Sequence, residues 1–345
     1  MQRRRLRDMS TEGSRTIRIG CLGAARIAPA ALIRPARNCA GVEVTAVAAR
    51  EKGRAEAFAS KHGVPRVYGS YRELVEADDV DAVYVPLPNG LHAEWAIAAI
   101  EAGKHVLCEK PFTANAGEAE RVRDIARRSD RVVMEAFHWR YHPLAQRMLD
   151  VISSGDLGRL TRIEAALVFP LPRWSDIRWQ LGLAGGSLMD AGCYPVHIVR
   201  TLAGTEPRVS SARAKVRTPQ VDRWIRAELD FGGGASGLVT AGMWASPVFR
   251  AQATVRGTAG TMTVINPLAP QFFNLLTVKA KGQTRRARVR GQATYDYQMQ
   301  AFADAVRDGK PFPTGPDDGV ANMRAIDAIY EAAGLEPRRG STDPY

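Results

Sequence analysis

The chain has 345 residues, and 45% of them are hydrophobic, so a folded protein of about two ordinary domains is expected rather than a disordered one. No apolar run approaches the length of a membrane span, and the four cysteines form no C-x-x-C pair of the kind that zinc and disulfide frameworks use. These features predict a reduced cytoplasmic protein with no membrane segment and no metal site.

The net charge of +12 is concentrated in two segments, residues 1–16 with +3 and residues 279–290 with +6. Residues 1–14 are predicted as a loose basic arm, because no apolar stretch follows them as in a secretory signal. In the second segment Arg286, Arg288 and Arg290 alternate, as on the exposed face of a strand. A solvated strand face is the simpler interpretation, and a patch that binds a polyanion is the alternative.

Strand and helix patterns alternate along residues 15–143. The strands are nearly continuous in apolar residues and the helices between them are amphipathic, which is typical of a parallel sheet covered on both faces. We therefore predict an α/β fold that begins with a Rossmann domain for a dinucleotide. The predicted strands are residues 16–23, 42–50, 80–88, 104–111 and 131–137. The predicted helices are residues 29–38, 53–63, 70–79, 91–103 and 115–128.

The first strand ends in a turn that partly matches the dinucleotide fingerprint G-x-G-x-x-G. Gly23 meets the tight turn, and Ala25 and Ala28 stand where the other glycines are expected. Alanine is the smallest replacement, so the backbone can still approach a pyrophosphate at the helix N-terminus. A tight turn without a ligand is the alternative. If the fingerprint is real, Arg26 and Ile27 also belong to the cofactor site.

The second strand ends in Ala48, Ala49 and Arg50. An NAD-binding unit usually places Asp or Glu here, where the carboxylate bonds the ribose 2′-hydroxyl. No acid stands in these three positions to repel a 2′-phosphate, and Arg50 can pair with one. The sequence thus favours NADP, with NAD as a possibility, and a plain surface role for Arg50 is the alternative.

After about residue 145 the pattern changes, and strands come one after another. We predict a second, α+β domain over residues 144–345, built on a large and mostly antiparallel sheet that binds substrate and mediates oligomerisation. A helix is predicted over residues 295–309, where Met299, Phe302, Ala303 and Val306 form one apolar stripe. The predicted strands are residues 159–169, 223–231, 235–244, 251–258 and 274–282.

Three longer segments carry a more specific signal: "VPLPNGLHAEWAIAAIEAGKHVLCEKP", "MEAFHWRYHP" and "GGSLMDAGCYPVH". Their order and spacing, together with the turn at Gly23, resemble the glucose–fructose oxidoreductase / inositol dehydrogenase / MocA (Gfo/Idh/MocA) family. The tyrosine in the third segment resembles the branch of dihydrodiol and D-xylose dehydrogenases. The resemblance implies hydride transfer between a nicotinamide and a hydroxyl-bearing carbon, and a homodimer or homotetramer.

The catalytic residues implied by this resemblance are Lys110, beside the nicotinamide and the reacting carbon, and Tyr194, as proton donor. Hydride transfer to or from an alcohol carbon requires a proton to move at its oxygen, which suits such a pair. A free tyrosine has a pKa of about 10, and a lysine cation nearby would favour the phenolate. Asp190 would orient or bond the substrate hydroxyl, and Glu109 would orient Lys110. Relatives often have the Lys–Pro bond in cis.

The remaining predicted site residues come from the same segments. Glu109 and Lys110 also count as cofactor contacts. Further contacts on the nicotinamide side are predicted at Pro86, Leu87, Asn89 and His92. Substrate contacts are predicted at Trp139, Arg140 and Arg178, besides the catalytic residues. Helix-start and hinge-packing roles are the alternatives for His92, Trp139 and Arg140, and His197 is expected to be a packed histidine.

The sequence therefore predicts an NADP-dependent oxidoreductase that acts on a sugar, polyol or vicinal diol. One alternative keeps the fold but reduces another carbonyl or imine substrate. The other alternative is a non-catalytic protein that senses a nucleotide or binds nucleic acid, which the charge and the incomplete fingerprint would suit. Since both members of the catalytic pair are present, we favour the enzyme, and a nucleic-acid partner is not expected.

Overall fold

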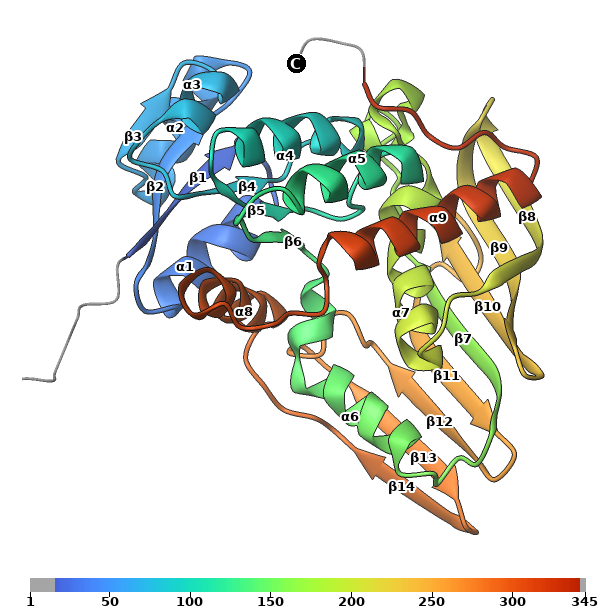
Figure 1. Cartoon of the computed structure of the whole chain (residues 1–345). Helices are drawn as coiled ribbons and strands as arrows, with labels where there is room; N and C mark the ends of the chain where they lie inside the picture. The colour runs from blue at the N-terminus through green and yellow to red at the C-terminus, as the bar shows by residue number, and fades with distance from the viewer. Residues whose placement is uncertain (1–15, 342–345) are drawn as a thin grey trace, which may run out of the picture.

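Two β-sheets organise the chain in the computed structural model, which describes residues 16–341 (Figure 1). The predicted basic arm, residues 1–14, lies outside the described residues. Among the residues described, none of the helices has the length and apolar character needed to cross a bilayer.

The first sheet is parallel and has the strand order β3-β2-β1-β4-β5-β6. The order reverses between β1 and β4, and in open α/β sheets ligands bind outside the carboxyl ends of the strands at such a switch point. The five predicted strands are confirmed, while β3 was missed because its three residues are exposed or only partly buried and form no apolar run. The strands are β1 (Ile17–Leu22), β2 (Val42–Ala48), β3 (Arg66–Tyr68), β4 (Ala82–Val85), β5 (His105–Cys108) and β6 (Val133–Glu135).

The predicted helices of the first domain are confirmed, and local signals set their ends. The side chains of Ser70 and Asn115 accept hydrogen bonds from the backbone N–H groups of Glu73 and Glu118, which caps two of the helices. Gly63 ends another helix in the left-handed conformation. The helices are η1 (Pro29–Ile33), α1 (Arg34–Asn38), α2 (Lys52–His62), α3 (Tyr71–Glu76), η2 (Asn89–Leu91), α4 (His92–Glu101), α5 (Ala116–Ala126) and η3 (His138–Tyr141).

The second sheet has the strand order β14-β13-β12-β11-β7-β10-β9-β8. Its neighbours pair antiparallel except β7 and β10, which are parallel, so the predicted fold class is confirmed. The strands β8 and β12 were not predicted. The strands are β7 (Leu160–Val168), β8 (Arg208–Thr218), β9 (Val221–Gly232), β10 (Ala235–Gly242), β11 (Arg250–Gly257), β12 (Gly260–Ile265), β13 (Leu275–Ala280) and β14 (Gln283–Ala287).

Helices α7 (Cys193–Ala203) and α9 (Pro316–Ala332) pack on the same face of this sheet, and α6 (Pro143–Ser153) lies beside α7 (Figure 1). A π-helix, η6 (Leu188–Gly192), leads directly into α7. Pro195 is the third residue of α7 and follows the π-helix closely. Irregular helix of this kind accompanies a proline, because the ring removes a backbone donor and crowds the preceding turn.

The late helix α8 (Thr294–Asp308) returns to the first domain. Its buried side chains Met299, Phe302 and Ala303 share an apolar core with Leu32 and Tyr84, and the helix lies beside α1 (Figure 1). The apolar stripe was predicted, but a stripe does not say which sheet it covers. A domain boundary at residue 143 therefore assigns α8 to the second domain, although the helix packs against the first.

The basic segment 279–290 forms the end of β13, the edge strand β14 and the residues that follow. All five residues of β14 are exposed, but Arg288 and Arg290 lie beyond its end, so the predicted alternation covers only Arg286. Arg285 and Lys281 form ion pairs with Asp156. Part of this charge is thus neutralised within the domain.

Candidate active site

A cleft of about 610 Å³ lies where the carboxyl ends of the first sheet meet the second domain. The loops after β1, β2, β4 and β5 form one side. Residues from β7, from the segment 169–183 and from the start of α7 form the other side. Because parallel strands end at one edge of their sheet, residues far apart in sequence converge here.

The turn after β1 lines one end of the cleft with Gly23, Ala25, Arg26 and Ile27, the residues at which cofactor contacts are predicted. Gly23 has a φ of +99°, which favours glycine, and its N–H donates to the carbonyl of Ala48. The small side chains leave the backbone accessible at the start of η1. This end of the cleft thus fits the phosphates of a dinucleotide.

Two arginines line the cleft beyond the end of β2. Arg50 was predicted here, and Arg54 joins it from the first turn of α2. The guanidinium of Arg50 also lies 3.8 Å from the carboxylate of Glu51, so an acid follows the arginine directly. The signal for Arg54 in the sequence was its place just inside the predicted helix, four residues after Arg50. Two cations at this place fit a ribose that carries a phosphate.

The loop after β4 brings Pro86, Leu87 and Asn89 to the cleft, whereas His92 does not reach it. The ring of His92 is fully buried, with its nitrogens 2.7 Å from the carbonyl oxygen of Pro111 and 2.9 Å from that of Leu87. His92 therefore holds two strand-end loops together from behind. Its position inside the domain, at the first turn of α4, explains why the predicted cofactor contact is not made.

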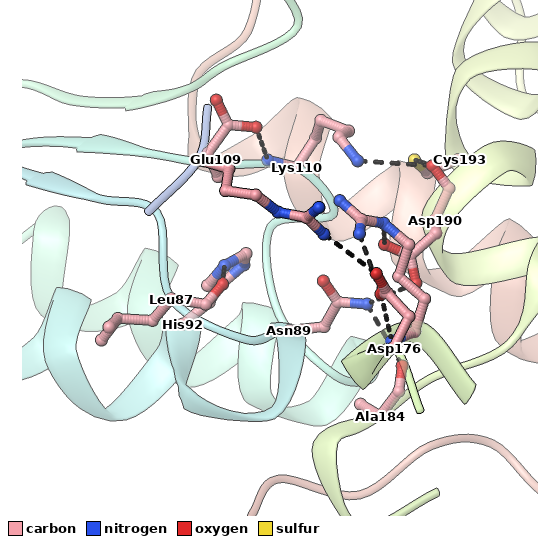
Figure 2. A network of polar contacts seen from close by, with 11 residues as sticks. Leu87, Asn89, His92, Glu109, Lys110, Asp176, Ala184, Asp190 and Cys193 are labelled. Carbon is pink, nitrogen blue, oxygen red and sulfur yellow. Dashed lines mark hydrogen bonds and ion pairs between the residues drawn. The ribbon is translucent and has the colours of Figure 1, made fainter. Parts of the chain in front are cut away.

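Lys110 follows β5 and points across the cleft toward the second domain (Figure 2). Its ammonium group donates to the backbone carbonyl of Asp190 at 3.3 Å and lies 5.2 Å from the ring centre of Tyr194. Glu109 accepts from the hydroxyl of Tyr84 at 2.8 Å and from the backbone N–H of Lys110 at 3.3 Å. Glu109 thus fixes the lysine backbone rather than its ammonium group. The Lys110–Pro111 bond is cis, as the resemblance implied.

Asp190 and Tyr194 both line the cleft from the junction of η6 and α7. One carboxylate oxygen of Asp190 lies 3.3 Å from Nε of Arg178, and the other accepts from the amide of Asn89 at 3.4 Å. Burial raises the pKa of Asp190, while Lys110 and Arg178 act in the opposite direction. These groups are well placed to bond substrate hydroxyls.

The phenol of Tyr194 has a pKa raised well above its ordinary value, mainly by burial and then by the neighbouring Tyr295 and Glu109. This differs from the expectation that Lys110 would favour the phenolate. The lysine cation lies over the ring rather than beside the oxygen, and the ring is only 8% exposed. Tyr194 therefore holds its proton, which suits a proton donor better than a resting base.

Trp139 and Arg140, predicted to contact substrate, are not part of the cleft wall. Trp139 is buried in the core and its indole N–H donates to Nδ1 of His197 at 3.0 Å. His197 in turn lies 2.9 Å from a carboxylate oxygen of Asp318 and is a packed histidine, as expected. These side chains of η3 and α7 pack against each other in the interior, with ring centroids 5.5 Å apart, rather than on the cleft wall.

Arg178, where a substrate contact is predicted, lines the cleft, and its partner Asp176 was missed. Asp176 accepts from Arg178 at 2.9 Å and from Arg26 at 3.1 Å, so it joins the turn after β1 to the residues around Asp190 (Figure 2). Burial alone would raise the pKa of Asp176, but the bonds from Arg178 and the charge of Arg26 lower it. A Cβ on Gly185 would lie 2.6 Å from the carbonyl oxygen of Arg178, which explains the glycine there.

Sequence reasoning also missed His138 and Tyr295. Tyr295 comes from α8 and lines the cleft, and His138 lies behind Tyr194 with its Nε2 3.0 Å from the phenol oxygen. His138 stands in the family segment "MEAFHWRYHP", and its place in that segment was the signal that could have marked it as a site residue. Within residues 16–341 no group of three or more His, Cys, Asp or Glu residues could hold a metal ion.

A parallel sheet whose switch point opens into a cleft with a lysine, a buried tyrosine and an aspartate is the arrangement of a nicotinamide-dependent oxidoreductase. Comparison with known families agrees. Residues 17–137 match the oxidoreductase family described as having an NAD-binding Rossmann fold, and residues 145–263 match the GFO/IDH/MocA C-terminal domain. The chain belongs to the Gfo/Idh/MocA oxidoreductase family, as its motifs predicted.

Individual relatives agree with the predicted branch. The chain is 38% identical over 318 residues to D-xylose 1-dehydrogenase (NADP(+)) 2 of Haloferax volcanii, covering 91% of this chain and 96% of that one. It is 31% identical over 226 residues to trans-1,2-dihydrobenzene-1,2-diol dehydrogenase of Xenopus laevis, covering 64% and 67%. The crystal structure of KijD10, a 3-ketoreductase from Actinomadura kijaniata in complex with NADP and TDP-benzene, superimposes with a TM-score of 0.85 at 30% identity, covering 92% and 98%.

Proposed function

We propose that this protein is an NADP-dependent oxidoreductase that transfers a hydride between the nicotinamide and a hydroxyl-bearing carbon of a sugar or vicinal diol. One observation carries the proposal. A single cleft has Arg50 and Arg54 at one end, which suit a 2′-phosphate, and Lys110, Asp190 and Tyr194 at the other. Relatives named as NADP-dependent xylose dehydrogenase and as a ketoreductase bound to NADP support both the cofactor and the reaction.

The roles of the residues follow from their positions. The bound cofactor would supply the hydride in reduction and accept it in oxidation. In reduction Tyr194 donates its phenolic proton to the carbonyl oxygen of the substrate as the carbon gains the hydride, so an alcohol results. The ammonium of Lys110 stabilises the negative charge that develops on that oxygen. Asp190, Arg178 and Asn89 hold neighbouring hydroxyls and so fix which carbon faces the nicotinamide.

The named relatives suggest two sizes of substrate: a free sugar, as for the xylose dehydrogenase, and a sugar joined to a nucleotide, as for the ketoreductase. A second cavity of about 570 Å³ is a reason to include nucleotide-linked sugars in a substrate screen, because it offers room for a nucleotide. It is lined by Trp224, Trp244, Lys215 and Arg223. The two cavities meet the same segment of chain, since Phe169 lines the cleft and the next residue, Pro170, lines the second cavity. Indole rings beside cations suit an anionic group that carries a ring.

A substrate screen with purified protein tests the proposal. Free aldoses such as D-xylose and vicinal diols are offered with NADP, and keto-sugars, free or linked to thymidine diphosphate, are offered with NADPH. We expect turnover in at least one set, and loss of that turnover in Tyr194→Phe. If no set is turned over while NADPH binds with high affinity, the reductase of another carbonyl or imine substrate becomes the better hypothesis. Binding of nucleic acid with a steep salt dependence would instead favour the non-catalytic alternative.

We also propose a homodimer or homotetramer assembled through the second domain. Helices α7 and α9 cover one face of its sheet, and the picture shows no helix of the described residues on the other face (Figure 1). Exposed apolar side chains such as Phe249 and Phe272 lie beside the same sheet.

The four cysteines are free and buried, which supports a reducing compartment such as the cytoplasm.

A further inference from the structure

His138 is a buried histidine directly behind Tyr194. It is 6% exposed, and its Nε2 lies 3.0 Å from the phenol oxygen of Tyr194. Its ring also contacts that of Tyr295, with centroids 4.2 Å apart. Both tyrosines line the cleft and His138 does not, so the histidine reaches the site only through them.

The protonation state of His138 follows from its surroundings. Burial, with a smaller effect of Lys110, lowers the pKa of His138 to about 3, so the ring is neutral and carries one N–H. Among residues 16–341 its Nδ1 has no hydrogen-bond partner. A proton on Nδ1 would be a buried donor with no acceptor, whereas a proton on Nε2 has the phenol oxygen of Tyr194. The tautomer with the proton on Nε2 is therefore favoured.

The direction of this hydrogen bond decides where the phenolic proton points. If the phenol donated to His138, its proton would face away from the cleft and would be lost to the substrate. If His138 donates, the phenol oxygen is held from behind and its own proton is free to turn toward the cleft. Only the second arrangement leaves Tyr194 ready to act.

We propose that His138 is a positioning residue, whose Nε2–H donates to the phenol oxygen of Tyr194 and aims the phenolic proton at the substrate oxygen. The inference rests on the role of Tyr194 given under the proposed function. During reduction the phenolic proton passes to the substrate oxygen, and the proton of His138 stays on Nε2. The bond strengthens at that moment, because the acceptor becomes a phenolate.

His142 provides a matched comparison within the same segment. It is also buried, its Nδ1 accepts from the backbone N–H of Leu144 at 3.0 Å, and its ring packs beside Tyr297 with centroids 5.4 Å apart. Neither His142 nor Tyr297 lines the cleft. A buried histidine that packs beside a tyrosine away from the cleft, without a bond to a catalytic group, should behave like His142.

The test uses a matched pair of side chains at position 138. Gln has an amide N–H near the position of Nε2, and Met has the same length without a donor. We expect His138→Met to lower kcat by roughly 10- to 100-fold, the effect of losing one hydrogen bond to a developing charge, with KM and the Kd of NADPH within about threefold. His138→Gln should recover most of kcat, and His142→Met should leave kcat within about threefold.

A double variant separates positioning from packing. In a Tyr194→Phe background there is no phenol to aim, so His138→Met should lower the residual kcat no further. Equal kcat values for the Gln and Met variants, or an equal loss with and without Tyr194, would overturn the role of His138. Near-normal kcat in Tyr194→Phe alone would instead refute the proton donor itself, and the role of His138 with it. If the Met variant fails to fold, His138→Gln is used in its place. It should keep most of kcat in the wild-type background and should not change the residual kcat in the Tyr194→Phe background.

Discussion

Substitution of the two arginines beyond β2 offers a direct test of the cofactor preference. Two unit charges 4 Å apart attract by about 1 kcal/mol in water and about 4 kcal/mol near a protein surface. The side chain of Arg50 is 49% exposed, and Arg54 is exposed too, so the lower part of this range applies. We expect Arg50→Ala to weaken NADPH binding by about 1–2 kcal/mol, or roughly 5- to 30-fold. The double variant with Arg54→Ala should lose about a hundredfold or more, since each cation contributes.

NADH serves as the internal reference, because it lacks the 2′-phosphate. Fluorescence titration of both cofactors should show that wild-type protein prefers NADPH, and that the variants lose this preference while the Kd of NADH changes little. Lys52 is the matched control, since it lies between the two arginines in sequence, is exposed, pairs with Glu56 and does not line the cleft. Equal weakening of NADPH and NADH by Arg50→Ala, or the same effect from Lys52→Ala, would refute the assignment.

Three further outcomes are expected. Tyr194→Phe and Lys110→Met should each lower kcat by at least about a hundredfold, because proton transfer or charge stabilisation is lost, and should leave the Kd of NADPH nearly unchanged. Stopped-flow or steady-state assays with the identified substrate measure this loss. Near-full activity of either variant would count against the role of the residue that it replaces. Burial raises the pKa of Asp327 to about 7, so the folded state keeps a proton that the unfolded state loses above about pH 4. Stability is therefore lost as pH rises from 4 to 7. Asp327→Asn should raise the free energy of unfolding at pH 8 by as much as roughly 4 kcal/mol, seen as a higher Tm, and should leave both unchanged at pH 4. An equal rise in Tm at the two pH values would contradict this prediction. Light scattering at micromolar concentration should give a multiple of the 37.6 kDa chain mass, and a monomer mass would end the proposal of an oligomer.

Short-range patterns predicted most of the first domain. Each of the five predicted parallel strands is a largely apolar run followed by a turn, and the triplet Glu109-Lys110-Pro111 stands at the end of one such strand. Because the carboxyl ends of parallel strands meet at one edge, the position of the lysine in the cleft followed from the order of strands. The same reasoning placed Arg50 and Asn89 correctly on the cleft wall.

Contacts between distant segments were beyond this reasoning. Asp176 belongs to a loop with no periodic pattern, and its role depends on Arg26, 150 positions earlier in the chain. Tyr295 reaches the cleft only because α8 returns to the first domain, which an apolar stripe cannot specify. His138 and Trp139 are neighbours in sequence, yet the first bonds the phenol of Tyr194 and the second bonds His197 in the core. A short 3₁₀ turn sends adjacent side chains in different directions, and its geometry is not visible in the sequence.

The position of Lys110 changes how its partnership with Tyr194 should be understood. Burial raises the pKa values of Glu109 and Asp190, and Lys110 opposes that effect at both carboxyl groups, whereas burial and other neighbours dominate the pKa of the phenol. If Lys110 and Tyr194 act as a unit, they must meet at the substrate oxygen, where the phenolic proton arrives and the lysine charge is felt. The double variant Lys110→Met, Tyr194→Phe should then have a kcat little below either single variant. Additive losses would mean that Lys110 acts through Asp190 instead, by keeping that carboxylate ionised for the substrate hydroxyl.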